Sequence, residues 1–142
     1  MIIHHIGLVV KNIEEHYNKY YYNALGFNEI SKIFVDKIIG VKVAFINLNN
    51  KIYLELIEPI NNSSPVFNFL QKRGSSLHHL CFEVENIHYE CERLREFNYL
   101  VTLSPTPAVA FDNRKIAFLM SKEENFLIEL LEKNEDSFSY QL

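Results

Sequence analysis

The sequence of 142 residues predicts an α+β domain built from two tandem βαβββ modules. An internal repeat is the first observation: HHIGLVVKNI at residues 4–13 aligns without a gap with HHLCFEVENI at residues 78–87, and LELIE at 54–58 returns as IELLE at 128–132. The order of periodic segments is the second, because each copy reads as one strand, one helix and three strands. Two copies are too few for a solenoid, so we expect one domain with a functional groove between its modules.

Composition favours a single globular domain over residues 1–142, since 48% of the residues are hydrophobic and 23% are charged. A net charge of −4 argues against a nucleic-acid partner. The N-terminal apolar run has no basic region before it and is too short for a membrane span, so neither a targeting segment nor a membrane partner is expected. Two cysteines, Cys81 and Cys91, then indicate reduced thiols and a cytoplasmic protein. The expected parts are module 1 at about 2–60, a linking helix at about 64–74, module 2 at about 77–133, and a polar tail at 134–142.

Module 1 starts with a strand over residues 2–10, which alternates and is rich in Ile and Val. Asn12 is expected to cap a helix with Glu15 as its capping-box partner, and Gly26 to end that helix in the left-handed conformation. Asn49 and Asn50 form the turn of a hairpin in the second half of the module. The three remaining strands are expected near 27–35, 41–48 and 51–58.

Ser64 and Pro65 are expected to begin a short linking helix that stops at Gly74. Module 2 then repeats the first, with a strand over 77–84 and a helix capped by Asn86. Its last three strands are expected near 99–104, 114–120 and 126–132.

Each module carries one histidine and one glutamate at the same spacing: His5 with Glu55, and His79 with Glu129. Side chains at alternate positions of a strand share a face, and the apolar neighbours of all four residues belong to the face that packs on the helices. The four candidates therefore point to the opposite face and converge if that face curls around a cleft. Two imidazoles and two carboxylates predict a site for one divalent transition ion, namely nickel, cobalt, manganese or zinc.

Other polar residues have simpler explanations. His4 and His78 fall on the core side of the alternation and are expected to be structural, and Cys81 shares the cleft face with His79, where a buried thiol is the plainer expectation. Arg114 and Arg73 are the candidates for binding a phosphate or carboxylate of a substrate, with a solvated cationic loop as the alternative.

Several segments together resemble the vicinal oxygen chelate superfamily, and within it the branch of glyoxalase I and methylmalonyl-CoA epimerase. They are HHIGLVVKNIEE, GVKVAF, LELIEP, SPVFNFLQKRG, LHHLCFEVENI and LIELLE. The resemblance implies the glyoxalase/bleomycin-resistance/dihydroxybiphenyl dioxygenase fold, a U-shaped mixed sheet around a metal cleft, with His5, Glu55, His79 and Glu129 as the ligands. The chain departs from the pattern at Val43, where some epimerases carry a second catalytic carboxylate, and in the segment 120–126, which lacks their His-Pro-Lys text and glycines.

The resemblance and the ligand set together predict a metal-dependent isomerase or lyase that moves a proton α to a carbonyl. Glu129 is expected to be the base and Glu55 its partner on the opposite face. Epimerisation of a 2-methylacyl-CoA, as in methylmalonyl-CoA epimerase, is the first expectation. A glyoxalase I (lactoylglutathione lyase) reaction on a hemithioacetal is the second, and a non-catalytic binding or resistance module is the third. A homodimer acting on a small carbonyl or thioester is expected, with the cleft either within one chain or shared across the dimer.

Overall fold

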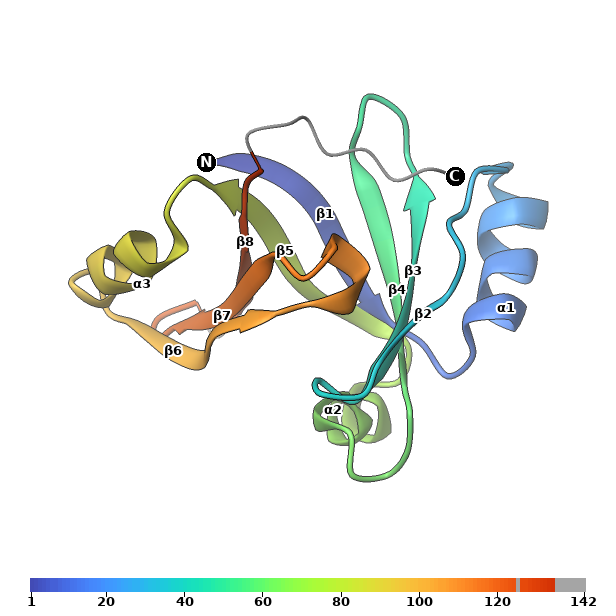
Figure 1. Ribbon diagram of the computed structural model, residues 1–142. Coiled ribbons are helices and arrows are strands. Elements are labelled where there is room, and N and C mark those ends of the chain that lie inside the picture. The colour runs from blue at the N-terminus through green and yellow to red at the C-terminus, as the bar shows by residue number, and fades with distance from the viewer. Residues whose placement is uncertain (125, 135–142) are drawn as a thin grey trace.

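The computed structural model describes residues 1–124 and 126–134 and contains an eight-stranded mixed sheet bent into a half-barrel (Figure 1). The strands of module 1 are β1 (Ile2–Val9), β2 (Phe34–Asp36), β3 (Val41–Asn47) and β4 (Tyr53–Pro59). The strands of module 2 are β5 (Ser76–Val84), β6 (Tyr99–Pro107), β7 (Lys115–Ser121) and β8 (Leu127–Glu132). The predicted α+β fold of two βαβββ modules is confirmed.

The strand order across the sheet is β2-β3-β4-β1-β5-β8-β7-β6, which repeats the same arrangement on either side of the centre. The two modules join where β1 and β5 pair antiparallel. Each of these strands also pairs in parallel with the last strand of its own module, β1 with β4 and β5 with β8. The four central strands are therefore the four that carry the predicted ligands.

The helix of module 1 begins where the sequence predicts but is not regular. The Asn12 side chain accepts a hydrogen bond from the Glu15 backbone N–H at 2.9 Å, which caps α1 (Ile13–His16). The helix continues as the π-helix η1 (Tyr17–Ala24), whose end has a wide turn in which Leu25 N–H donates to the carbonyl of Tyr20. Gly26, with φ of 80°, ends it as predicted.

The other helices agree closely with prediction. Asn86 caps α3 (Ile87–Arg95) by accepting from Tyr89 N–H at 3.0 Å. The linking helix α2 (Pro65–Arg73) begins with Pro65 and ends at Gly74, whose φ is 68°. Ser64 is its N-cap by position only, because its side chain makes no capping hydrogen bond. Figure 1 shows α1 and α3 at opposite ends of the bent sheet, with α2 near the point where the modules join.

The prediction of a strand over residues 27–35 is largely wrong. Only Phe34–Asp36 forms a strand there, preceded by a single bridge between Ile30 and Ile46. The Ser31 hydroxyl accepts the backbone N–H of Phe45 at 2.8 Å, so a side chain replaces a bond of the regular ladder. The hairpin turn is confirmed, since Asn49 and Asn50 have φ values of 90° and 52°.

Three apolar clusters stabilise the sheet. Two lie beneath the helices: α1 packs on a cluster with Leu8 and Leu56, and α3 packs on one with Leu119 and Leu130. The third fills the concave side and draws on both modules, including Phe45, Phe111 and Leu131. In the described ranges, no helix is long and apolar enough to cross a membrane. Apart from Asn134, the predicted polar tail lies outside the described residues.

Candidate metal centre

The four predicted ligands meet on the concave side of the sheet. The Nε2 atoms of His5 and His79 lie 3.0 Å apart. The Glu129 Oε2 atom is 3.0 Å from Nε2 of His79 and 3.6 Å from Nε2 of His5. The Glu55 Oε1 atom lies 3.5 Å and 3.6 Å from the same two nitrogens. All four side chains are buried, so the repeat brings its two histidines and two glutamates into one enclosed cluster.

The separations between these donor atoms fit one divalent cation. Ligand atoms that each lie about 2.1 Å from a common centre are separated by about 3.0 Å at octahedral angles and about 3.4 Å at tetrahedral angles. The Glu129 Oε1 atom is buried and has no hydrogen-bond partner within the described part of the chain. Two buried carboxylates beside two imidazoles require a positive charge to offset their desolvation, and a divalent transition ion suits this set of nitrogen and oxygen donors.

The two carboxylates differ electrostatically although the repeat relates them. Burial, and then the negative charge of Glu129, raise the pKa of Glu55 well above its usual range. Burial also acts to raise the pKa of Glu129, but the charges and hydrogen bonds of His5 and His79 outweigh it and hold that pKa below its usual range.

Two rows of cross-strand neighbours run through the site, each with three residues on adjacent strands. In each row a small residue lies between a histidine and a glutamate. Gly7 on β1 lies between Glu55 on β4 and His79 on β5. A Cβ atom at Gly7 would meet the His79 ring at 2.3 Å, so only glycine leaves room for that imidazole. This role of Gly7 was not predicted from the sequence, although a glycine inside a strand, at the position that cysteine occupies in the other copy of the repeat, is a signal of close approach.

The second row has Cys81 on β5 between His5 on β1 and Glu129 on β8. Cys81 is fully buried, in agreement with the prediction of a buried thiol. Burial, and then the negative charges of Glu129 and Glu55, raise the pKa of this thiol well above its usual range. Cys81 therefore remains a neutral thiol beside the cluster.

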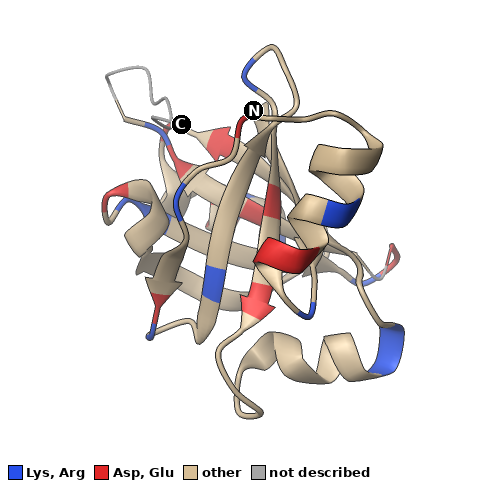
Figure 2. Ribbon diagram, turned by 90° about the vertical axis from the view of Figure 1, so that its right-hand side faces the viewer, with Lys and Arg blue, Asp and Glu red and all other residues tan. Residues whose placement is uncertain are grey.

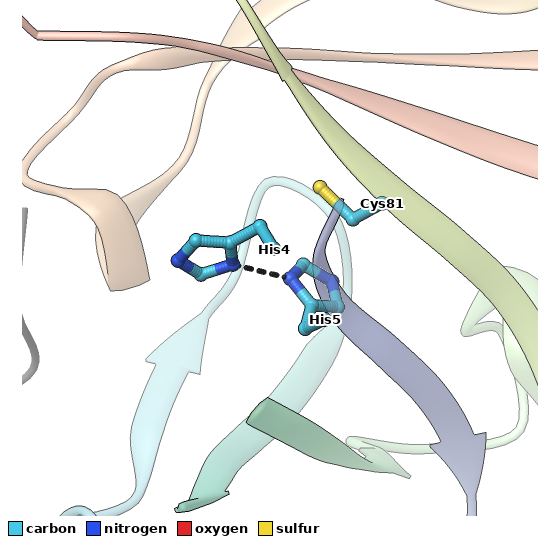
Figure 3. A group of neighbouring side chains, drawn as sticks. All are labelled: His4, His5 and Cys81. Atoms are coloured by element: carbon cyan, nitrogen blue, oxygen red, sulfur yellow. Dashed lines mark hydrogen bonds between the residues drawn. The ribbon is translucent and has the colours of Figure 1, made fainter. Parts of the chain in front are cut away.

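The expected position of His4 and His78 on the helix side of the sheet is wrong. The His4 Nδ1 atom lies 2.8 Å from Nδ1 of His5 (Figure 3), and the same distance separates Nδ1 of His78 from Nδ1 of His79. His78 also lines the central cavity. The pairing of β1 with β5 shifts register between Ile3 and His5, and again between Gly7 and Leu8, and such shifts break the simple alternation of faces.

Both of these histidines are uncharged at neutral pH. Burial, and then the neighbouring His5, lower the pKa of His4 to about 3. Burial, and then the neighbouring His79, lower the pKa of His78 to about 3. His5 and His79 therefore each have a neutral imidazole as their nearest polar neighbour.

A cavity of about 390 Å³ adjoins the cluster, and Glu55, His79 and Glu129 line it. Its walls are mostly apolar and come from both modules of one chain. They include Val43 and Ile57 from module 1 and Ile116, Phe118 and Leu127 from module 2. Both modules of the chain thus contribute to the walls of this cavity.

Asp36 is a polar residue of the cavity wall that the sequence analysis missed. It is buried, and its Oδ1 atom accepts hydrogen bonds from the backbone N–H groups of Ile38 and Ile39 at 3.1 and 3.0 Å. Its Oδ2 atom accepts from Val109 N–H, at 3.4 Å, in the 3₁₀ helix η2 (Val109–Phe111). Asp36 therefore connects the edge of module 1 to a loop of module 2. Because its side chain is acidic, it is not a candidate for binding an anionic group of a substrate.

The structure brings neither Arg114 nor Arg73 into the cavity. Arg114 is buried, and its guanidinium donates to the backbone carbonyls of Phe111 and Glu132 at 3.3 and 3.2 Å. Arg73 lies at the end of α2, where its guanidinium stacks 5.2 Å from the centre of the Phe69 ring. On the side shown in Figure 2, segments with Lys or Arg are dispersed among segments with Asp or Glu. The substrate-binding role expected for both arginines therefore remains a prediction without a contact in the cavity to support it.

Comparison with known proteins gives a consistent result. Residues 4–118 match the sequence model of the Glyoxalase/Bleomycin resistance protein/Dioxygenase superfamily. The chain is 32% identical over 133 residues to the mitochondrial methylmalonyl-CoA epimerase of Dictyostelium discoideum, covering 92% of this chain and 78% of that protein. It is 33% identical over 130 residues to the ethylmalonyl-CoA/methylmalonyl-CoA epimerase of Cereibacter sphaeroides, covering 90% and 95%. Among solved structures, a Streptomyces coelicolor methylmalonyl-CoA epimerase variant in complex with 2-nitronate-propionyl-CoA superposes with a TM-score of 0.82 at 25% identity, covering 94% and 97%.

Proposed function

Because the chain belongs to the glyoxalase/bleomycin resistance protein/dioxygenase superfamily, we propose that it is an isomerase that epimerises a 2-methyl-branched acyl-CoA, with methylmalonyl-CoA as the first substrate to test. The relatives named above are epimerases of such thioesters, and one related structure contains an acyl-CoA analogue. The observation that carries the proposal is the convergence of one buried glutamate from each module beside an apolar cavity.

We propose that His5, Glu55, His79 and Glu129 hold one nickel, cobalt, manganese or zinc ion. The donor separations of 3.0 to 3.6 Å support this assignment. A bound divalent ion would act as a Lewis acid on a substrate carbonyl oxygen and make the adjacent C–H more acidic.

The glutamates supply the proton transfer. Glu129 is the first candidate for the base, because its Oε1 atom is buried and has no hydrogen-bond partner among the described residues. Glu55 reaches the cluster from the other module and is the candidate for returning a proton to the opposite face of the same carbon. One proton leaves the α-carbon to Glu129 and one arrives from Glu55, so the product is an isomer and no redox partner is needed.

The apolar wall determines what the cleft can hold. Val43 on β3 occupies a position where some epimerases carry a carboxylate, and its buried side chain lines the cavity. Glu55 therefore has to serve as the second proton carrier. The walls of Ile57, Ile116 and Phe118 exclude water around the reacting carbon, and a dry site strengthens its electrostatic interactions.

The same apolar residue at Val43 also favours a second candidate, the glyoxalase I type of isomerisation of a hemithioacetal. That reaction moves a proton between adjacent carbons and requires no further carboxylate at β3. A non-catalytic binding module would use the cavity without any hydrogen exchange.

Hydrogen exchange separates the three functions. Metal-reconstituted protein is incubated in deuterated water with methylmalonyl-CoA and, separately, with the methylglyoxal–glutathione adduct, and mass spectrometry follows the substrate. Epimerisation predicts deuterium at the α-carbon of methylmalonyl-CoA, glyoxalase chemistry predicts turnover of the adduct only, and a binding module predicts neither.

The base is tested in the same assay with Glu129→Gln. This change keeps an oxygen at the site but removes the proton acceptor, so the rate should fall about 10²-fold or more. Glu132→Gln, near the end of the same strand, is the matched control and should exchange as the unmodified chain does. Undiminished exchange by metal-loaded Glu129→Gln would place the base elsewhere.

A further inference from the structure

We propose that His4 and His78 are positioning residues, each accepting a hydrogen bond from the Nδ1–H of the adjacent ligand imidazole, His5 or His79, and so fixing its tautomer and ring orientation. This inference rests on the proposed metal centre and concerns two residues that are not themselves ligands.

The geometry of the two pairs is nearly identical. The Nδ1 atoms are 2.8 Å apart in both. The ring centroids lie 5.1 Å apart in both, with interplanar angles of 83° for His4 with His5 and 84° for His78 with His79. Two modules of different sequence thus build the same edge-on contact, which indicates a constraint shared by both halves of the site.

Each ligand imidazole uses its two nitrogens differently. The Nε2 atoms of His5 and His79 face the cluster, at 3.0 Å from each other. An imidazole that offers its Nε2 lone pair to a cation carries its proton on Nδ1, and that buried N–H requires an acceptor. The Nδ1 atom of the preceding histidine lies at hydrogen-bonding distance, so His4 and His78 accept there and carry their own protons on Nε2.

A competing explanation involves Cys81. His4, His5 and Cys81 form a buried group (Figure 3), and their possible ligand atoms lie within 4.8 Å of one another. Such a group could hold a second ion. Comparison of the two copies of the repeat argues against this second ion. The position of Cys81 corresponds to Gly7, which offers no ligand, yet the contact between His78 and His79 has the same 2.8 Å length. The thiol is therefore not the cause of the contact between the paired histidines.

Aromatic walls hold both acceptor rings. The His4 ring lies 5.4 Å from the Tyr53 ring and 5.7 Å from the Phe111 ring. The His78 ring packs edge-on against Phe69 at 4.9 Å. Packing from different elements leaves each acceptor little rotational freedom, so the ligand ring it contacts is fixed as well.

The test measures metal affinity, with no need for activity. His78→Phe and His4→Phe keep a planar ring but remove the acceptor, whereas His78→Asn and His4→Asn restore an acceptor near the Nδ1 position. Cobalt(II) is titrated into each variant in competition with a chromophoric chelator, and its visible absorption spectrum is recorded. The phenylalanine variants should bind cobalt about 10- to 100-fold more weakly, the scale for lost outer-shell partners, and the asparagine variants should recover most of that loss.

His88→Phe, at an exposed histidine of α3, is the matched control and should leave affinity and spectrum unchanged. Folded phenylalanine variants with the affinity and spectrum of the unmodified chain would overturn the proposal. A second measurement needs no substitution: long-range ¹⁵N–¹H spectra of the zinc-loaded protein should show His5 and His79 protonated on Nδ1, and His4 and His78 on Nε2. Protonation of His4 and His78 on Nδ1 would also overturn it. Failure of the unmodified chain to bind any divalent ion would instead refute the proposed metal centre.

Discussion

The two modules bring the same histidine and glutamate to the centre, but they differ in the residue that lies between the proposed ligands. In one row Gly7 separates Glu55 from His79, and the imidazole occupies the space of a missing side chain, 2.3 Å from where a Cβ would be. In the other row Cys81 separates His5 from Glu129 and fills the corresponding space with a buried thiol. A repeated motif has therefore produced two halves that are alike in their ligands and unlike in what surrounds them.

This difference extends to the carboxylates. The distance from Glu129 Oε2 to His79 Nε2 is 3.0 Å, which is the shortest carboxylate–imidazole distance in the cluster. The Glu55 Oε1 atom lies 3.5 Å or more from the Nε2 atom of either histidine. The pKa of Glu55 is raised, first by burial, whereas the imidazoles hold the pKa of Glu129 low. The two carboxylates therefore differ in their surroundings although the repeat relates them.

Removing the ligands gives the largest expected effect and measures how equally the modules contribute. His5→Ala and His79→Ala should each weaken metal binding by more than the roughly 10- to 100-fold that the loss of an outer-shell partner costs. The double variant should lack stoichiometric metal by elemental analysis, with His88→Ala as the control. Full occupancy in the double variant would refute the centre, and equal losses in the single variants would show that the modules contribute alike.

Gly7→Ala should give the next largest effect, because it adds a methyl group only to the row that has no room for it. The His79 ring has to move away, and a ligand displaced by an ångström should cost about 10²-fold in rate. Overpacking should also lower the free energy of unfolding by about 1–3 kcal/mol. The deuterium-exchange assay measures the loss in rate, thermal unfolding measures the loss in stability, and cobalt titration measures the effect on metal binding.

Cys81→Ala is the matched control for Gly7→Ala, since its row already accommodates a Cβ atom. Metal affinity should change by less than about 10-fold, the lower end of the range for lost outer-shell partners. If the Gly7→Ala variant bound cobalt as tightly as the Cys81→Ala variant, the close approach of the His79 ring would not explain why residue 7 is a glycine.

The four residues of the cluster could be predicted from the sequence, whereas the positions of His4 and Gly7 could not, and the reasons are physical. Strand alternation is a local property and the repeat is visible in the sequence itself, so the two together were sufficient to predict that His5, Glu55, His79 and Glu129 converge. The position of His4 could not be predicted in this way, because register shifts between β1 and β5 depend on the pairing of strands distant in sequence. The role of Gly7 was hidden for a similar reason, since it depends on a ring from the other module.

The irregular segment before β2 shows a different limit. Its β-branched residues predict a strand, but the Ser31 hydroxyl takes a backbone N–H of β3, and this competing bond cannot be read from periodicity. Asp36 likewise has no repeat partner to draw attention to it, and its contact with Val109 joins residues of different modules, which periodicity does not predict.

The smallest expected effect comes from making the two rows alike. Cys81→Gly removes a buried thiol and frees the backbone, which should lower the free energy of unfolding by about 1–2 kcal/mol through the cavity and the added chain entropy. Metal binding should persist, because all four ligands remain. If the thiol beside Glu129 is what distinguishes it from Glu55, then Glu55→Gln and Glu129→Gln should reduce deuterium exchange more equally in the Cys81→Gly background than in the unmodified chain. A double-mutant cycle on the exchange rate measures this coupling directly. An unchanged ratio of the two rates would mean that the nearer imidazole, His79, distinguishes the carboxylates, and that the cysteine only fills the space that its counterpart Gly7 leaves open.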